Sequence, residues 1–234
     1  MVSGKPDEKA EPPRFKKISK PMTVKIKAAA ASITGTVELL YFGQPTIGEA
    51  VVDTLQICQL IHEANPRIIV KVYDSESDKK VCTEMGVLFF PTLIIKGKNK
   101  GSLRFLGTPL GYQLPVLVDA LKNASEGLSG LKPKTLEKLD SIKKDLNIKT
   151  FVTPVCPYCP RVSKLVVGLA IESPRVKAEI INAGDFTYVS KKYKVEGTPR
   201  TVVNEKLDID GALHESDFME RLMAIVSGHC QIYQ

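Results

Sequence analysis

The chain has 234 residues, of which 43% are hydrophobic and 25% are charged, and this composition suits a folded protein of one large or two ordinary domains. No run approaches the roughly 18 apolar residues needed to cross a bilayer, and the charged N-terminus lacks the apolar stretch of a signal peptide, so we expect a cytoplasmic protein without a membrane association. Residues 1–35 hold eight Lys or Arg and three Asp or Glu, so 8 − 3 = +5 of the net charge of +7 lies there, and we expect no nucleic-acid-binding face in the remainder.

Residues 1–20 mix charges with Pro and Lys and are predicted to be a disordered basic tail.

Two segments of the chain share one order of predicted elements. Residues 21–124 form the first predicted unit. Its elements are a strand at 37–42, a helix with apolar positions Ile47, Val51, Leu55 and Cys58, a strand at 67–73, a helix at 77–85, strands at 92–96 and 102–106, and a helix at 110–123.

The second predicted unit, residues 134–228, repeats this order after a linker at 125–133 that is rich in small residues. An opening helix is expected at 134–146, and a short tail at 229–234. The remaining elements are a strand at 148–152, a helix with Val162, Leu165, Val166 and Leu169 on one face, a strand at 176–182, a helix at 186–193, strands at 201–204 and 207–210, and a helix at 216–226. The two units predict an α/β fold, each with a mixed central sheet flanked by helices.

The motif Cys156-Pro-Tyr-Cys159 places two thiols three residues apart, where they can form a disulfide. We expect a helix to start near Cys156, because Pro157 and Pro160 both suit a first helical turn. Unpaired N–H groups and the helix dipole would stabilise a Cys156 thiolate, lowering a thiol pKa of ~8.5 to roughly 3.5–7.5, and we expect Cys156 to be exposed. Cys156 is therefore the predicted nucleophile, and Cys159 is the predicted resolving thiol.

Other interpretations of the cysteines remain open. A Cys-x-x-Cys motif can be half of a zinc site, but Cys58, Cys82 and Cys230 form no second such pair, so we expect no metal site. A purely structural disulfide is a further alternative. The corresponding turn of the first unit, residues 43–49 (GQPTIGE), has no thiol, so that unit is predicted to be redox-inert.

The motif CPYC, followed by an apolar helix and by Gly197-Thr198-Pro199 before a strand, resembles the active-site layout of thioredoxin-fold proteins, and CPYC itself is similar to glutaredoxins. The resemblance implies that Pro199 is a cis-proline facing the cysteine pair and that the Thr198 backbone pairs with substrate. Together with Pro157 and Tyr158, these residues are the predicted substrate-binding residues.

The duplication resembles two groups, the protein disulfide oxidoreductases of thermophiles and the N-terminal region of the flavoprotein subunit of alkyl hydroperoxide reductase. The resemblance rests on residues 104–112 (RFLGTPLGY), 173–177 (SPRVK) and 182–186 (NAGDF). It implies a thiol:disulfide oxidoreductase without a bound cofactor. A thioredoxin-reductase-like flavoprotein would reduce it, and protein disulfides or a peroxiredoxin would receive its electrons.

Three alternatives to this function stay open. A disulfide-forming or isomerising enzyme would have a higher reduction potential than a reductase. A glutaredoxin-like iron–sulfur carrier would use the Cys156 thiolate as a cluster ligand. A binding module or chaperone would keep its function without Cys156. The missing thiols in the first unit favour an electron relay over an isomerase.

Overall fold

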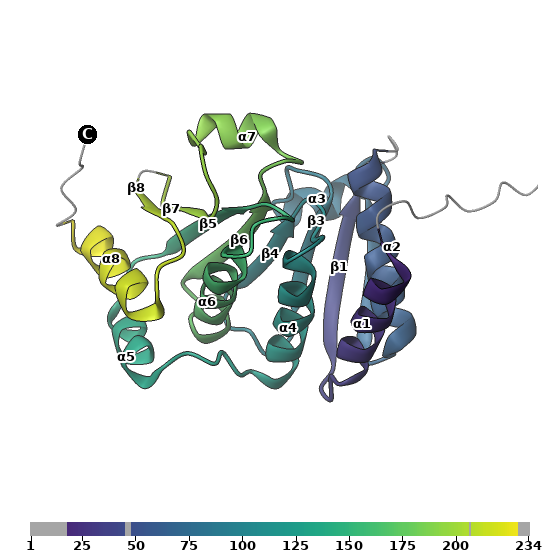
Figure 1. Ribbon diagram of the computed structural model, residues 1–234, viewed down its shortest axis with the longest axis horizontal. Coiled ribbons are helices and arrows are strands. Elements are labelled where there is room, and N and C mark those ends of the chain that lie inside the picture. Colours follow the sequence, from purple (N-terminus) through teal and green to yellow (C-terminus); the bar gives the residue numbers. More distant parts are fainter. Residues whose placement is uncertain (1–17, 45–47, 206, 229–234) are drawn as a thin grey trace, which may run out of the picture.

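The computed structural model describes residues 18–44, 48–205 and 207–228 and shows one sheet with helices packed along it (Figure 1). The elements in chain order are α1 Lys20–Ala31, β1 Val37–Gly43, α2 Glu49–Ala64, β2 Ile68–Asp74, α3 Lys79–Glu84, β3 Thr92–Lys96, β4 Ser102–Leu106, α4 Gln113–Glu126, α5 Pro133–Ser141, β5 Leu146–Val152, α6 Cys159–Glu172, β6 Val176–Asn182, α7 Thr187–Lys192, β7 Arg200–Val203, β8 Leu207–Asp210 and α8 Glu215–Ser227. The predicted α/β class with two tandem units is confirmed.

The two units have the same strand pairing. In the first unit β1 pairs with β2 in parallel and with β3 antiparallel, and β3 pairs antiparallel with β4. In the second unit β5 pairs with β6 in parallel and with β7 antiparallel, and β7 pairs antiparallel with β8. This repeated pairing is the structural form of the sequence duplication.

The two four-stranded sheets join into one eight-stranded sheet of order β2-β1-β3-β4-β6-β5-β7-β8. The junction is a parallel pairing of β4 with β6, from Ser102 opposite Lys177 to Leu106 opposite Ile181. Because β4 and β6 would otherwise be edge strands with unpaired backbone groups, this pairing satisfies both edges and ties the units together. The boundaries of the units, 21–124 and 134–228, stay a prediction.

The core lies mainly on one face of the sheet. Alternate strand residues such as Leu39, Phe105 and Ile148 face the large apolar cluster under α1, α2, α4, α5, α6 and α8. Strand residues that point to the opposite face, such as Leu40 and Phe151, contact two smaller clusters under α3 and α7. The two-residue period of the strands therefore supplies apolar side chains to both layers of helices.

Three helices illustrate where the structure differs from the predictions. Helix α1 was not expected from the sequence, and Ser19 caps it by accepting a hydrogen bond from the Met22 N–H. Helix α5 ends at Ser141 instead of residue 146, because Leu146 joins the sheet and its N–H donates to Arg175 O. Helix α6 begins at Cys159 instead of near Cys156.

Some predictions concern residues outside the described parts of the chain. Residues 1–17 of the predicted tail, the tail at 229–234 with Cys230, and residues 45–47 of the first unit's turn all lie outside them. Within the described residues, none of the helices combines the length and the hydrophobicity that a membrane span needs.

Candidate active site

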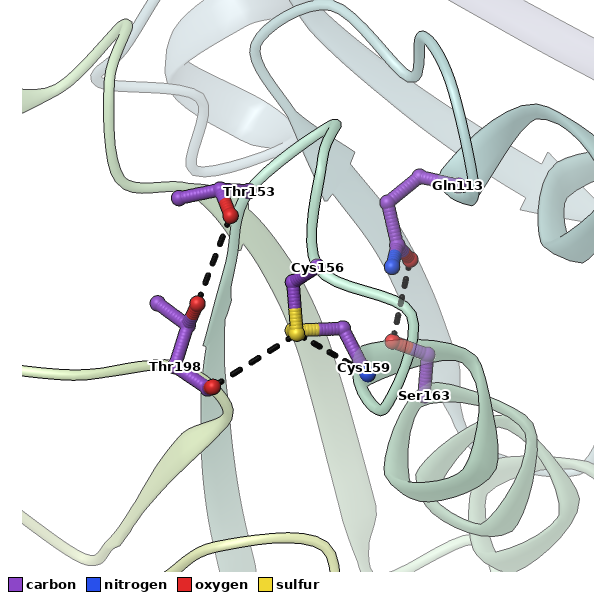
Figure 2. Close-up of a disulfide and its surroundings, with 6 residues drawn as sticks. All are labelled: Gln113, Thr153, Cys156, Cys159, Ser163 and Thr198. Atoms are coloured by element: carbon purple, nitrogen blue, oxygen red, sulfur yellow. Dashed lines mark hydrogen bonds between the residues drawn. A yellow bond between two sulfur atoms is a disulfide. The ribbon is translucent and has the colours of Figure 1, made fainter.

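Cys156 and Cys159 lie where β5 passes into α6, and their sulfur atoms form a disulfide (Figure 2). Their Cα atoms are 5.5 Å apart, within the usual range for a disulfide. Residues 156–158 form a turn ahead of the helix, and Pro160 occupies its first turn, where a missing N–H costs no hydrogen bond. The motif therefore sets both the start of α6 and the spacing of the two sulfur atoms.

The Cys156 sulfur is held by backbone groups on two sides. The Cys159 N–H donates to Cys156 Sγ over 3.1 Å, and the Thr198 carbonyl oxygen lies 3.5 Å from the same sulfur. The prediction that Cys156 is exposed is wrong for the disulfide form, in which 8% of the residue is accessible. The loop at Thr198 and the start of α6 cover it. Cys159 is less accessible still, at 0%.

The remaining predicted site residues surround the disulfide. The Thr198–Pro199 peptide bond is cis, as the resemblance implied, and Pro199 is buried while Thr198 is half-buried. Pro157 is exposed, and Tyr158 is 66% exposed beside the cysteines. The structure thus brings all six predicted site residues into one region, although their roles stay predictions.

Sequence reasoning missed several polar contacts at this site. Thr153 Oγ1 lies 3.3 Å from Thr198 Oγ1, which joins the loop before Cys156 to the loop at Pro199. The first unit also reaches the site, since the Tyr112 N–H donates to Pro154 O over 2.9 Å. Gly111, at φ +57°, lies so close that a Cβ there would be 2.1 Å from Pro154 O. Both first-unit residues belong to the stretch 104–112 that carries the resemblance, which was the available signal.

A second cross-unit contact lies beside the disulfide (Figure 2). Ser163 Oγ, on α6, is 3.0 Å from Gln113 Oε1, at the start of α4. Both residues are buried. Neither was singled out by the sequence, because nothing local to either position indicates that they meet.

The cysteines of the first unit lie away from this chemistry. Cys58 and Cys82 are buried free thiols, and the burial of Cys58 agrees with its place among the apolar positions of its predicted helix. Burial raises the pKa of the Cys58 thiol, and burial together with the Asp78 and Asp74 carboxylates raises the pKa of the Cys82 thiol. Neither thiol is therefore primed for exchange at neutral pH. No cluster of three or more potential metal-ligating side chains occurs among the described residues.

Two basic residues follow the motif, and both have partners. Lys164 forms an ion pair of 2.7 Å with Asp119 on α4. Arg161 donates to the carbonyl oxygen of Ala212 over 3.1 Å. The ion pair with Asp119 partly compensates the Lys164 charge, and the backbone N–H groups at the start of α6 add positive potential at Cys156.

Similarity to known proteins agrees with this geometry. Residues 146–224 match the model of the thioredoxin domain family. The F subunit of alkyl hydroperoxide reductase from Escherichia coli (strain K12) is 32% identical over 110 residues, which are 47% of this chain and 21% of that protein. The chain therefore spans only about a fifth of the length of this curated relative.

Two solved structures share the fold over most of the chain. A protein disulfide oxidoreductase from Aeropyrum pernix K1 superposes with a TM-score of 0.82 and 27% identity, covering 93% of this chain and 97% of that one. The NTD_N/C domain of alkylhydroperoxide reductase AhpF from Enterococcus faecalis (V583) has a TM-score of 0.76 and 19% identity, covering 87% and 99%. The chain is a tandem thioredoxin-fold protein with a cysteine pair at disulfide distance, similar to these two proteins.

Proposed function

We propose that this chain is a thiol:disulfide oxidoreductase that reduces protein disulfides or relays electrons to them, with Cys156 as nucleophile and Cys159 as resolving thiol. One observation carries the proposal. The Cys156–Cys159 disulfide lies at the start of α6, with Cys156 as its more accessible sulfur, against the Thr198–Pro199 loop. The similarity to a protein disulfide oxidoreductase supports the same activity.

The reaction transfers two electrons in two exchange steps. The Cys156 thiolate attacks one sulfur of the client disulfide, forming a Cys156–client bond, and the other client sulfur leaves as a thiolate that takes a proton. Cys159 then loses its proton and attacks Cys156 Sγ. This forms the Cys156–Cys159 disulfide and releases the second client thiol. The client is reduced, and the protein's own dithiol is oxidised.

The geometry supports this assignment of roles. The Cys159 N–H that donates to Cys156 Sγ in the disulfide is available to stabilise a Cys156 thiolate after reduction. Pro157 and Tyr158 lie on the exposed side of the cysteines, where a client would approach. The half-buried Thr198 offers backbone groups to an extended client segment, while Pro199 forms the buried base of its loop.

The partners follow from the chemistry and the relatives. The first unit has no thiol in the turn that corresponds to the motif, so electrons from a reductant would enter through the second unit. We propose a thioredoxin-reductase-like flavoprotein as that reductant and protein disulfides or a peroxiredoxin as acceptors. The similarity to the F subunit of alkyl hydroperoxide reductase supports this electron path.

Turnover of a protein disulfide by the wild type and by Cys156→Ser tests the proposal, with NADPH and a thioredoxin reductase, and separately with dithiothreitol, as reductant. We expect the wild type to turn over and the variant to be inactive. An active Cys156→Ser variant would exclude the dithiol mechanism and favour a binding module. Visible absorbance after anaerobic purification would instead favour an iron–sulfur carrier.

The reduction potential separates the proposed reductase from a disulfide-forming or isomerising enzyme. A potential near that of thioredoxin, about −270 mV, supports reduction of clients. A potential near about −180 mV or higher would assign the chain to disulfide formation or isomerisation.

A further inference from the structure

Gln113 is a polar side chain of the first unit that is buried next to the redox helix of the second. It is the first residue of α4, and only 3% of its surface is accessible. Figure 2 shows its side chain pointing from α4 toward the first turns of α6, where Ser163 and Cys159 lie. Its Oε1 is 3.0 Å from Ser163 Oγ, so the hydroxyl of the fully buried Ser163 donates to the amide.

The other end of the same amide is an unused donor. Gln113 Nε2 is buried and has no hydrogen-bond partner among the described residues while the cysteines form a disulfide. A buried donor without a partner is unfavourable, because it has lost its hydrogen bonds to water and gained none in return. An acceptor that exists only in another state of the protein would recover that free energy in that state.

Reduction of the disulfide creates an acceptor of this kind, because the Cys159 sulfur then becomes a thiol or a thiolate. Ser163 follows Cys159 by four residues in α6, so both side chains project from the same face of the helix. Cys159 is fully buried, and burial opposes the thiolate that it must form in the resolving step. The strand that leads into the motif, β5, contains no acidic residue in its sequence LNIKTFV that could assist.

We propose that Gln113 is a positioning residue through which the thiol-free first unit tunes the dithiol of the second, its amide N–H favouring the reduced cysteine pair. This proposal rests on the proposed function and deepens it. The first unit is then part of the redox site: its Tyr112 N–H holds the loop before Cys156, and its Gln113 amide supplies a donor beside α6.

The test measures the equilibrium between the full-length protein's cysteine pair and reduced and oxidised glutathione, for the wild type, Gln113→Met and Ser163→Ala. Methionine has a similar length to glutamine but cannot donate a hydrogen bond. We expect Gln113→Met to lower the equilibrium constant for reduction about tenfold, equal to a potential about 30 mV more negative. Ser163→Ala removes the hydroxyl but keeps the amide donor, so we expect a change of less than about twofold.

The proposal would be overturned if the equilibrium constant for reduction of Gln113→Met lay within about twofold of the wild-type value. Ser163→Ala with the same fall as Gln113→Met would also overturn it, because the effect would then come from the position of α6 rather than from the donor. Circular dichroism and urea unfolding of each oxidised variant show that the compared proteins are folded. The equilibrium involves only the protein's own cysteines and glutathione, so its result is independent of whether a client is turned over.

Discussion

The N–H of Cys159 donates to Cys156 Sγ over 3.1 Å, so the proposed resolving residue also supplies a donor for the proposed nucleophile. The two cysteines are therefore unequal. Cys156 keeps some access to solvent, whereas Cys159 has none. Because an attacking thiol must reach its client, the asymmetry favours Cys156 for the first attack.

Replacing the proposed resolving cysteine should trap the first intermediate. We expect Cys159→Ser to accumulate a mixed disulfide between Cys156 and a client protein, because no second thiol remains to release it. Mass spectrometry of the complex under non-reducing conditions identifies the linked cysteine. The double variant Cys156→Ser with Cys159→Ser is the control and should form no adduct, whereas an adduct on Cys58 or Cys82 would contradict the assignment.

Gly111 should be intolerant of a side chain. In Gly111→Ala the new Cβ would lie 2.1 Å from Pro154 O at a backbone φ of +57°. We expect a loss of about 2–4 kcal/mol in the free energy of unfolding by urea, and lower turnover, since the displaced loop leads directly into Cys156. Gly130→Ala is the matched control, because φ there is +69° but no atom lies within 4 Å of the new Cβ. Equal losses in the two variants would show that the contact with Pro154 contributes nothing.

Glu179 should stabilise the second unit at the strand that borders the first. It is buried on β6, opposite Arg104 of β4 and Lys149 of β5, and it pairs with Lys177 at 2.7 Å and Lys149 at 3.6 Å. We expect Glu179→Gln to lower the free energy of unfolding by about 1–3 kcal/mol, because the lysine charges lose their buried partner.

An exposed ion pair provides the comparison for Glu179. Glu84 lies 4.0 Å from Lys80 on α3, with both side chains exposed, so Glu84→Gln should change stability by less than about 0.5 kcal/mol. A Glu179→Gln variant as stable as Glu84→Gln would show that the stability of the fold does not depend on this charge.

The Cys58 thiol should make stability fall at alkaline pH. Burial raises its pKa in the folded protein above the ordinary value of 9.0, so the unfolded chain loses this proton first. The stabilisation is complete below about pH 9 and is lost as the pH rises above it. Urea unfolding of the oxidised protein across this range should show a smaller decline for Cys58→Ala than for the wild type. Parallel declines would contradict the assignment.

The sequence by itself predicted the order of elements from β1 onward and the position of the cysteine pair. Strands β3, β4, β6 and β8 have the bounds that their apolar runs and flanking turns predict, because strand patterns are local. The motif Cys156 to Cys159 also carries its spacing and its prolines within four residues. Local sequence was a poorer guide to helix ends: α5 stops at Ser141 because pairing with β6 draws Leu146 into a strand.

Only the tertiary structure decided how the two units cooperate. The pairing of β4 with β6 makes one sheet from two, and it places residues 111–113 of the first unit against Pro154 and Ser163 of the second. Gln113 and Ser163 are 50 residues apart in sequence, and neither carries a local signal of the other. Contacts of this kind follow from which strand edges meet and from the packing of buried side chains, so they arise only when the whole chain has folded.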